Sequence, residues 1–219
     1  LASRLPSWGT MGEALRTYHA ELWTSVGVAV AAGVAAVWMG LSVVAGRRLR
    51  AVVIVAVLIF GLLPGALVGV AVLAAYQQVD LVYNHWPLLA IGYVARYGWI
   101  GVLVAWLAWR SVGSDVVAQA RIDGAGEMDI ALALRYRPNV ALLLCGVGVV
   151  AAMSLADVAL GSLLTVPGIG PISGKLMEKF HRFEDGMLVS LSLWLVAGAL
   201  PAAVLGWLVL RLRRGAAGR

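Results

Sequence analysis

The chain has 219 residues, of which 62% are hydrophobic and only 13% are charged, with a formal net charge of +6. Since soluble domains carry roughly 25% charged residues, this composition indicates an integral membrane protein and excludes an ordinary soluble domain. The positive charge does not indicate nucleic-acid binding, because basic residues of membrane proteins sort to the cytoplasmic side and set the orientation of the chain.

The cysteine and the histidines of the sequence predict neither a disulfide nor a metal site. Cys145 is the single cysteine and lies in an apolar run, which excludes an internal disulfide. His19, His85 and His181 lie far apart and have no ligand spacing around them, so we expect no metal site. No cofactor is expected either.

Residues 1–21 mix polar and apolar side chains. We expect an interfacial or extramembrane lead-in there, with a helix over residues 10–21. The stretch carries charges that a signal peptide of the usual form would lack. Because the sequence starts at Leu1 rather than at a methionine, we expect a fragment, or one half of a fused polypeptide.

Five apolar runs are long enough to cross a hydrocarbon core of ~30 Å. They cover residues 22–46, 51–76, 85–109, 139–156 and 186–210. Proline removes a backbone donor, so we expect Pro64 to divide the second run into two helical pieces. We assign residues 22–214 to one transmembrane domain, followed by a basic tail at 215–219.

Two polar connections are expected on the outer side. One covers residues 77–84. The other covers 157–185 and contains two breakers, at Pro167 and Pro171, followed by a short helix near 175–183. His181 with Glu184 and Asp185 suggests either a metal site or a solvated face that contacts a binding protein, and we favour the solvated face.

The most polar part of the chain is the stretch 113–138, which we call the polar loop. It carries both acids and arginines between two apolar runs. These charges would be unsatisfied in hydrocarbon, so the loop must lie outside the membrane. Gly124 stands among small residues where a helix would turn. We therefore predict two short helices joined at Gly124.

The basic residues favour a cytoplasmic polar loop. With five spans, eleven arginines fall on the inner side: Arg47, Arg48, Arg50, Arg110, Arg121, Arg135, Arg137, Arg211, Arg213, Arg214 and Arg219. Five bases fall outside: Arg4, Arg16, Lys175, Lys179 and Arg182. Arg96 lies within the third run.

The polar loop resembles that of the permease subunits of binding-protein-dependent ABC transporters. The family pattern is EAA, three residues, Gly, nine residues, then Ile-x-Leu-Pro. Here Ala118-Gln119-Ala120 stands at the EAA positions, Gly124 at the glycine, and Leu134 at the isoleucine. Two residues depart from the pattern, because Ala118 replaces the glutamate and Pro138 lies one place late.

Other stretches extend the resemblance over residues 22–210. Residues 62–69 read LLPGALVG, similar to the L-P-G-x-x-x-G of the second core helix. Residues 154–158 and 163–168 resemble the family's outer segment, and 181–185 stands where iron(III)-type permeases carry a His-containing stretch. The chain is most similar to the iron(III) branch, in which two such halves are often fused, and it resembles the second half.

The resemblance implies an all-α, polytopic helical bundle with the type I permease core of an ABC importer, in the bacterial inner (plasma) membrane. It implies partners: cytoplasmic ATP-binding subunits, an external solute-binding protein, a second permease half and membrane lipid. No catalytic residue is implied. The loop residues expected to couple to the ATPase are Ala118, Gln119, Ala120, Arg121, Asp123, Gly124, Ala125 and Gly126.

The implied function is ATP-driven import of a small solute, with ferric iron as the first candidate. Thiamine, polyamine and sulfate permeases share much of the pattern, and a degenerate, non-transporting scaffold is the other alternative. An ion-driven carrier is disfavoured, because such carriers need acids inside the membrane and no Asp or Glu falls inside a predicted span.

Arg96, Pro64 and Asp157 are candidates for the translocation path. An intramembrane charge such as Arg96 suggests function, but Arg96 would equally snorkel to the interface or pair with the backbone. Asp157 would face the substrate or cap the outer segment. Pro64 marks a helix break. In each case we favour the structural role.

Overall fold

The computed structural model describes residues 8–46, 50–83, 85–165, 171–183, 185–198 and 204. Every regular element within these ranges is helical, which confirms the all-α prediction. The main helices are α1 (Trp8–Ala45), α2 (Arg50–Leu62), α3 (Gly65–Tyr76), α5 (Pro87–Arg110), α6 (Ser114–Ile122), α8 (Val140–Ala156), α9 (Val158–Leu163) and α10 (Ile172–His181). The short elements are α4 (Asp80–Tyr83), α7 (Glu127–Asp129), a π-helix (Ile130–Tyr136) and a 3₁₀ turn (Arg137–Asn139).

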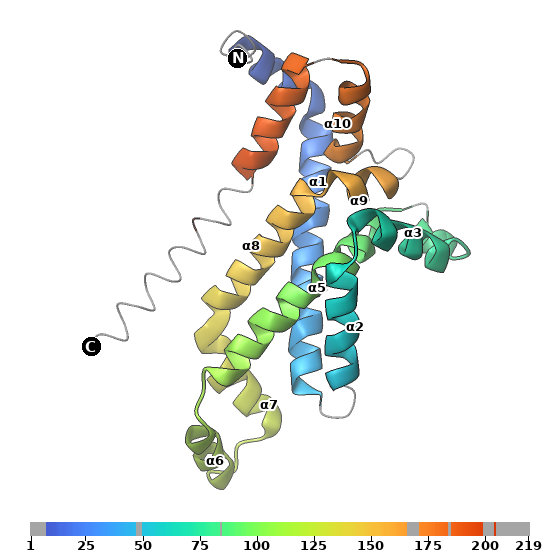
Figure 1. Ribbon diagram of the computed structural model, residues 1–219. Helices are drawn as coiled ribbons and strands as arrows, with labels where there is room; N and C mark the ends of the chain where they lie inside the picture. Colours follow the sequence, from blue (N-terminus) through green and yellow to red (C-terminus); the bar gives the residue numbers. More distant parts are fainter. Residues whose placement is uncertain are drawn as a thin grey trace.

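Helix α1 is the axis of the bundle, and α5 and α8 cross it (Figure 1). Small residues let these helices approach closely. A Cβ atom added at Gly40 would meet the backbone of Gly101, and one added at Gly101 would meet the carbonyl of Ala36. Backbone therefore packs directly against backbone where α1 and α5 cross.

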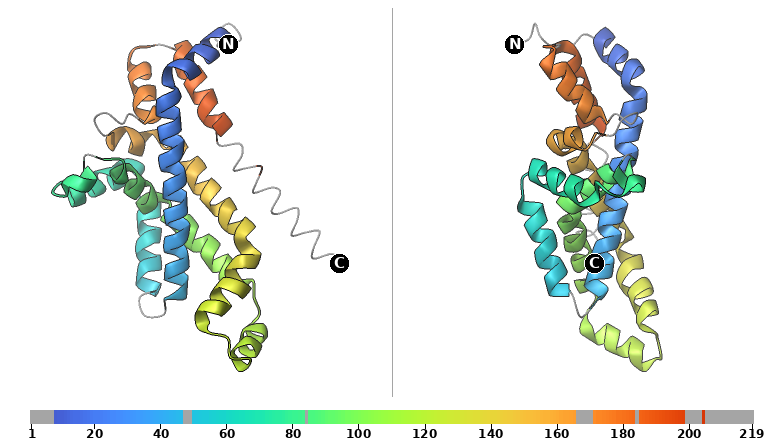
Figure 2. Two further views of the ribbon diagram at one scale, coloured as in Figure 1. Left: turned by 180° about the vertical axis from the view of Figure 1, so that it is seen from behind. Right: turned by 90° about the vertical axis from the view of Figure 1, so that its right-hand side faces the viewer.

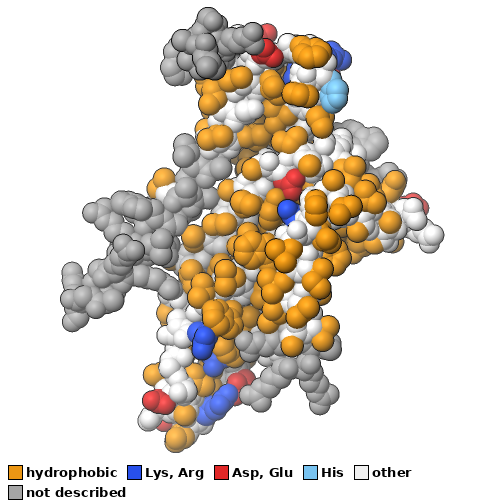
Figure 3. All heavy atoms as spheres, in the orientation of Figure 1, with side chains coloured by type: hydrophobic (Ala, Val, Ile, Leu, Met, Phe, Trp, Pro, Cys, Tyr) orange, Lys and Arg blue, Asp and Glu red, His pale blue; other side chains and the backbone are white. Residues whose placement is uncertain are grey.

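In the described part of the chain, three helices are long and apolar enough to cross a membrane: Gly9–Ala45, Pro87–Arg110 and Glu127–Ala156. They correspond to the first, third and fourth predicted spans. Hydrophobic side chains cover most of the face shown in Figure 3, and charged ones lie near its two ends and at one place between them. The prediction of a polytopic membrane protein is supported at this level.

In the other two predicted spans, the described residues form shorter helices. The second run is divided at Pro64 into α2 and α3, as expected. Of the fifth run, Asp185–Gly198 is an apolar helix. The rest of this run, except residue 204, lies outside the described residues, and so do Pro201 and the basic tail. The same holds for Arg47, Arg48, Pro167 and Glu184.

The lead-in is helical, as expected, and meets the first span at a kink. Helix α1 runs from Trp8 to Ala45, but Tyr18 has non-helical angles (φ −114°, ψ 20°), three residues before the expected boundary at residue 21. Ala14 in the first piece is buried together with Leu176 of α10 and Leu191 of the helix Asp185–Gly198, and Tyr18 packs against this cluster. The position of the lead-in outside the membrane stays a prediction.

The outer connection holds two helices rather than one. Asp157 caps α9, and α10 starts after Pro171, three residues earlier than predicted. Figure 2 shows α9 and α10 beside the upper half of α1. This connection therefore covers the end of the bundle opposite the polar loop.

The close crossing of α1 and α5 predicts that Gly101→Ala destabilises the chain by about 1–3 kcal/mol, because the added methyl group must displace backbone. The measurement is the free energy of unfolding in mixed detergent micelles titrated with sodium dodecyl sulfate. Gly27→Ala is the matched control, since nothing lies within 4 Å of a Cβ there. Equal stability of the two variants would contradict the packing.

Candidate functional site

The polar loop begins with a helix that ends in a glycine turn. Gly124 has φ +85°, a left-handed conformation that favours glycine. The amide of Ala125 donates to the carbonyl of Ala120 (2.9 Å), and the amide of Gly124 donates to that of Arg121 (3.1 Å). This pair of hydrogen bonds is the Schellman arrangement. The turn predicted at Gly124 is thus present and closed by backbone hydrogen bonds.

A salt bridge spans the turn. The Nε of Arg121 lies 2.7 Å from Oε1 of Glu127, so α6 and α7 are tied together. The hydrogen bond to Glu127 raises the pKa of Arg121. Both side chains are largely exposed, and such pairs contribute little to stability. The salt bridge restricts the geometry of the turn, and it engages Arg121 inside the loop.

The loop protrudes beyond the rest of the bundle (Figures 1 and 2). Three of its apolar side chains face outward, since Ile122 is 82% exposed, Met128 70% and Val116 52%, whereas Val117 and Ile130 are buried. Among the residues expected to couple, Ala118, Gln119, Asp123 and Gly126 are exposed, and Ala120 and Ala125 are half-buried. Exposed apolar residues at the tip of a polar protrusion are typical of a docking surface.

The second half of the loop differs from the prediction. Helix α7 continues through the π-helix and the 3₁₀ turn into α8, so residues 127–138 begin a spanning helix rather than form a separate short one. The amide of Arg137 donates to the carbonyl of Leu132, five residues back. A π turn shifts the hydrogen-bond register, which accommodates Pro138 without breaking the helix.

Arg135 joins this helix to the end of α5. Although it belongs to the loop that was predicted to lie outside the membrane, Arg135 is only 8% exposed, and its guanidinium carbon lies 3.4 Å from the centre of the Trp109 ring. Nearby, Nδ2 of Asn139 donates to Oγ of Ser111 and to the carbonyl of Arg135, both at 2.7 Å. These contacts fasten the base of the loop to both flanking helices.

A second polar group lies at the break between α2 and α3. Pro64 has no N–H, so the helix cannot satisfy the carbonyls of its last turn. Nη1 of Arg96 donates to the carbonyl of Gly61 at 2.8 Å. The intramembrane arginine thus pairs with backbone, in agreement with the favoured interpretation.

Asp157 completes this group. Its Oδ1 accepts from the amide of Leu160 (3.0 Å) as the cap of α9, and its Oδ2 accepts from the hydroxyl of Tyr97 (2.8 Å). A Cβ at Gly65 would lie 2.9 Å from Oδ2, so the carboxylate rests against the N-terminus of α3. A helix N-terminus attracts negative charge. Asp157 therefore caps the outer segment, which is the structural role that the sequence analysis favoured.

We call Gly61, Pro64, Arg96, Tyr97 and Asp157 the break cluster. It brings together the three residues that the sequence proposed separately for the translocation path. Sequence reasoning missed Tyr97, which follows Arg96 directly, and missed Trp109 at the base of the polar loop. A phenol on a buried helix face beside an arginine was the available signal for Tyr97.

The outer helix α10 carries a solvated charged face. Glu178 accepts from Lys175 (3.3 Å) and pairs with Arg182 (3.0 Å), and the hydrogen bond from Lys175 is the main cause of its lowered pKa. Nδ1 of His181 lies 2.7 Å from the carbonyl of Met177. Among the described residues, no three His, Cys, Asp or Glu side chains gather as a metal would require.

The hydrogen bond between Tyr97 and Asp157 predicts a coupling of about 1.5–3 kcal/mol in a double-mutant cycle of Tyr97→Phe and Asp157→Ala. The measurement is again the free energy of unfolding in detergent. Tyr83→Phe is the control, because this exposed tyrosine lies on α4 and its change should add independently to Asp157→Ala. Additive effects of the first pair would contradict the contact.

In comparisons with known proteins, no protein-family model matches the chain. The search of curated proteins finds no relative.

Proposed function

We propose that this chain is a permease subunit of an ATP-driven ABC importer. The observation that carries the proposal is the protruding helix–glycine turn–helix between two long apolar helices, at the position where the permease pattern has its coupling loop. Such a subunit does no covalent chemistry. It forms part of the path for the solute and moves when separate cytoplasmic subunits bind and hydrolyse ATP.

The geometry of the polar loop suits a docking element. Backbone hydrogen bonds fix the turn at Gly124, and the Arg121–Glu127 salt bridge links its two arms. The exposed Ile122 and Met128 offer apolar surface to a groove on the ATP-binding subunit. Preorganised elements of this kind bind with a lower entropic cost.

The base of the loop would carry its movement into the bundle. Arg135 stacks on Trp109 of α5, while Asn139 bonds to Ser111 just after α5. A displacement of the loop would therefore move α5 and the start of α8 together. Rocking of packed helices is a recognised mode of switching, and it fits the small residues at the crossing of α1 and α5.

The break cluster supports a role as a joint rather than as a solute-binding site. Nη1 of Arg96 and both carboxylate oxygens of Asp157 bond to groups of this chain, whereas Nε of Arg96 is buried without a hydrogen-bond partner among the described residues. A joint makes most of its polar contacts within the protein, whereas a binding site presents most of them to a ligand. We therefore assign Arg96, Pro64 and Asp157 to the mechanics of the path.

Ferric iron is the proposed solute, on the similarity to the iron(III) branch, with thiamine, polyamine and sulfate as alternatives. One observation favours a second candidate, a non-transporting membrane scaffold. Ala118, which replaces the family's glutamate, is exposed on α6, so the charge that family members present there is lacking. Co-purification with an ATP-binding subunit separates the two functions.

The docking role predicts that Gly124→Asp abolishes ATP-driven uptake while leaving membrane insertion intact, because an aspartate at φ +85° strains the turn and alters the docking tip. Uptake and ATP hydrolysis are measured in vesicles holding the chain and its co-purified ATP-binding subunit. Gly113→Asp is the matched control: its φ is −64°, a Cβ meets nothing within 4 Å, and it precedes α6 as an N-cap.

Normal uptake by Gly124→Asp would remove the support for docking.

A second measurement tests the orientation of the polar loop relative to the membrane. In a variant with Cys145→Ala and Ile122→Cys, a membrane-impermeant maleimide should label the thiol only in inside-out vesicles, and labelling from outside would overturn the cytoplasmic assignment.

A further inference from the structure

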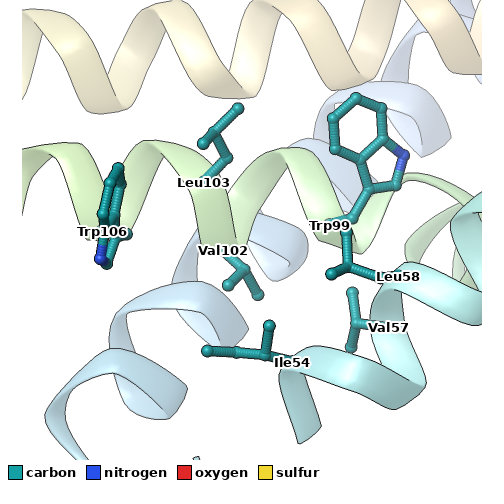
Figure 4. Close-up of a pocket in the computed structure, with 7 residues that line it drawn as sticks. All are labelled: Ile54, Val57, Leu58, Trp99, Val102, Leu103 and Trp106. Atoms are coloured by element: carbon teal, nitrogen blue, oxygen red, sulfur yellow. The ribbon is translucent and has the colours of Figure 1, made fainter. Parts of the chain in front are cut away.

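A groove of about 320 Å³ runs between α2 and α5. Its lining is entirely apolar and comes from Ile54 to Leu58 on α2 and from Trp99 to Trp106 on α5 (Figure 4). The side chain of Leu58 is 46% exposed and that of Leu103 is 44% exposed, so the groove opens to the surroundings. Both helices lie in runs that the sequence assigns to the membrane, so those surroundings are lipid.

One end of the groove is cationic. Trp106 lies one turn before Arg110, the last residue of α5, and the guanidinium carbon of Arg110 lies 4.8 Å from the centre of the Trp106 ring. Within the described part of the chain, Arg110 forms no salt bridge. Helix α2 begins at this same end of the bundle (Figure 1).

A molecule bound in this groove must fit both the apolar lining and the cationic end at Arg110. In hydrocarbon, an apolar groove gains only dispersion energy from a guest, so its lining alone does not distinguish one lipid from another. A positive group between helices near the membrane surface adds attraction for anionic headgroups, and guanidinium binds phosphate by charge-assisted hydrogen bonds.

A partner helix fits the groove less well than a lipid chain. Helices that associate in membranes approach through small residues, whereas this groove presents Trp99, Trp106 and Leu103. A thin, flexible acyl chain can follow such a surface. We propose that the groove binds one acyl chain of an anionic phospholipid, with its phosphate at Arg110.

This site is separate from the polar loop and from the break cluster, and it does not depend on the proposed transport function. The test uses the full chain reconstituted in nanodiscs of phosphatidylcholine with a minor fraction of phosphatidylglycerol. After transfer to detergent, native mass spectrometry counts the retained lipids. We expect wild-type protein to retain phosphatidylglycerol in preference to phosphatidylcholine.

Two variants test the two parts of the site. Arg110→Gln should lower the apparent affinity for phosphatidylglycerol about fivefold, by removing one basic group near the surface, and Arg182→Gln at the outer end should not. Leu58→Trp should fill the groove and displace the lipid. Ile59→Trp is its matched control, because Ile59 neighbours it on α2, is 54% exposed and does not line the groove.

Circular dichroism and elution volume verify that each variant is folded. Equal retention of the two lipids by wild type would overturn the proposal, as would unchanged retention in Leu58→Trp. If Leu58→Trp instead changes only the oligomeric state, the groove takes a partner helix and the lipid assignment is wrong. If Leu58→Trp does not fold, Arg110→Gln alone decides, and unchanged selectivity would refute the site.

Discussion

Backbone polar groups in hydrocarbon must find partners within the protein, and the break at Pro64 is where this constraint governs the structure. The proline ends α2 and leaves carbonyl groups of its last turn without a partner in the helix. Arg96 satisfies the carbonyl of Gly61. The neighbouring Tyr97 binds Asp157, which also caps α9. A helix break, an intramembrane cation and an outer connection are therefore parts of one arrangement.

Helix α5 links the break cluster to the polar loop. In its first half it carries Arg96 and Tyr97 of the break cluster, and at its end Trp109 stacks under Arg135 at the base of the polar loop. Along its middle, backbone packs against α1 at Gly101. In a permease, a movement of the loop would reach the outer connection through this one helix.

Much of the fold was predictable because hydrophobic length is a local property. The third span, the division at Pro64 and the turn at Gly124 follow from composition and from the conformational limits of proline and glycine. The packing of the lead-in was not predictable, because Ala14 and Tyr18 contact helices more than 150 residues away. The prediction of a separate second short helix in the loop was wrong, because the π turn accommodates Pro138 and the helix continues into α8. Neither effect has a local signal.

The sequence by itself determined that this is an all-helical membrane protein with one polar loop, since those properties depend on the hydrophobicity and charge of consecutive residues. Only the tertiary structure decided what the polar residues do. It brought Pro64, Arg96 and Asp157 into one cluster, buried Arg135 on Trp109, and left an apolar groove ending at Arg110. Each of these depends on groups from different helices, whose distances are set by how the helices cross and not by their separation along the chain.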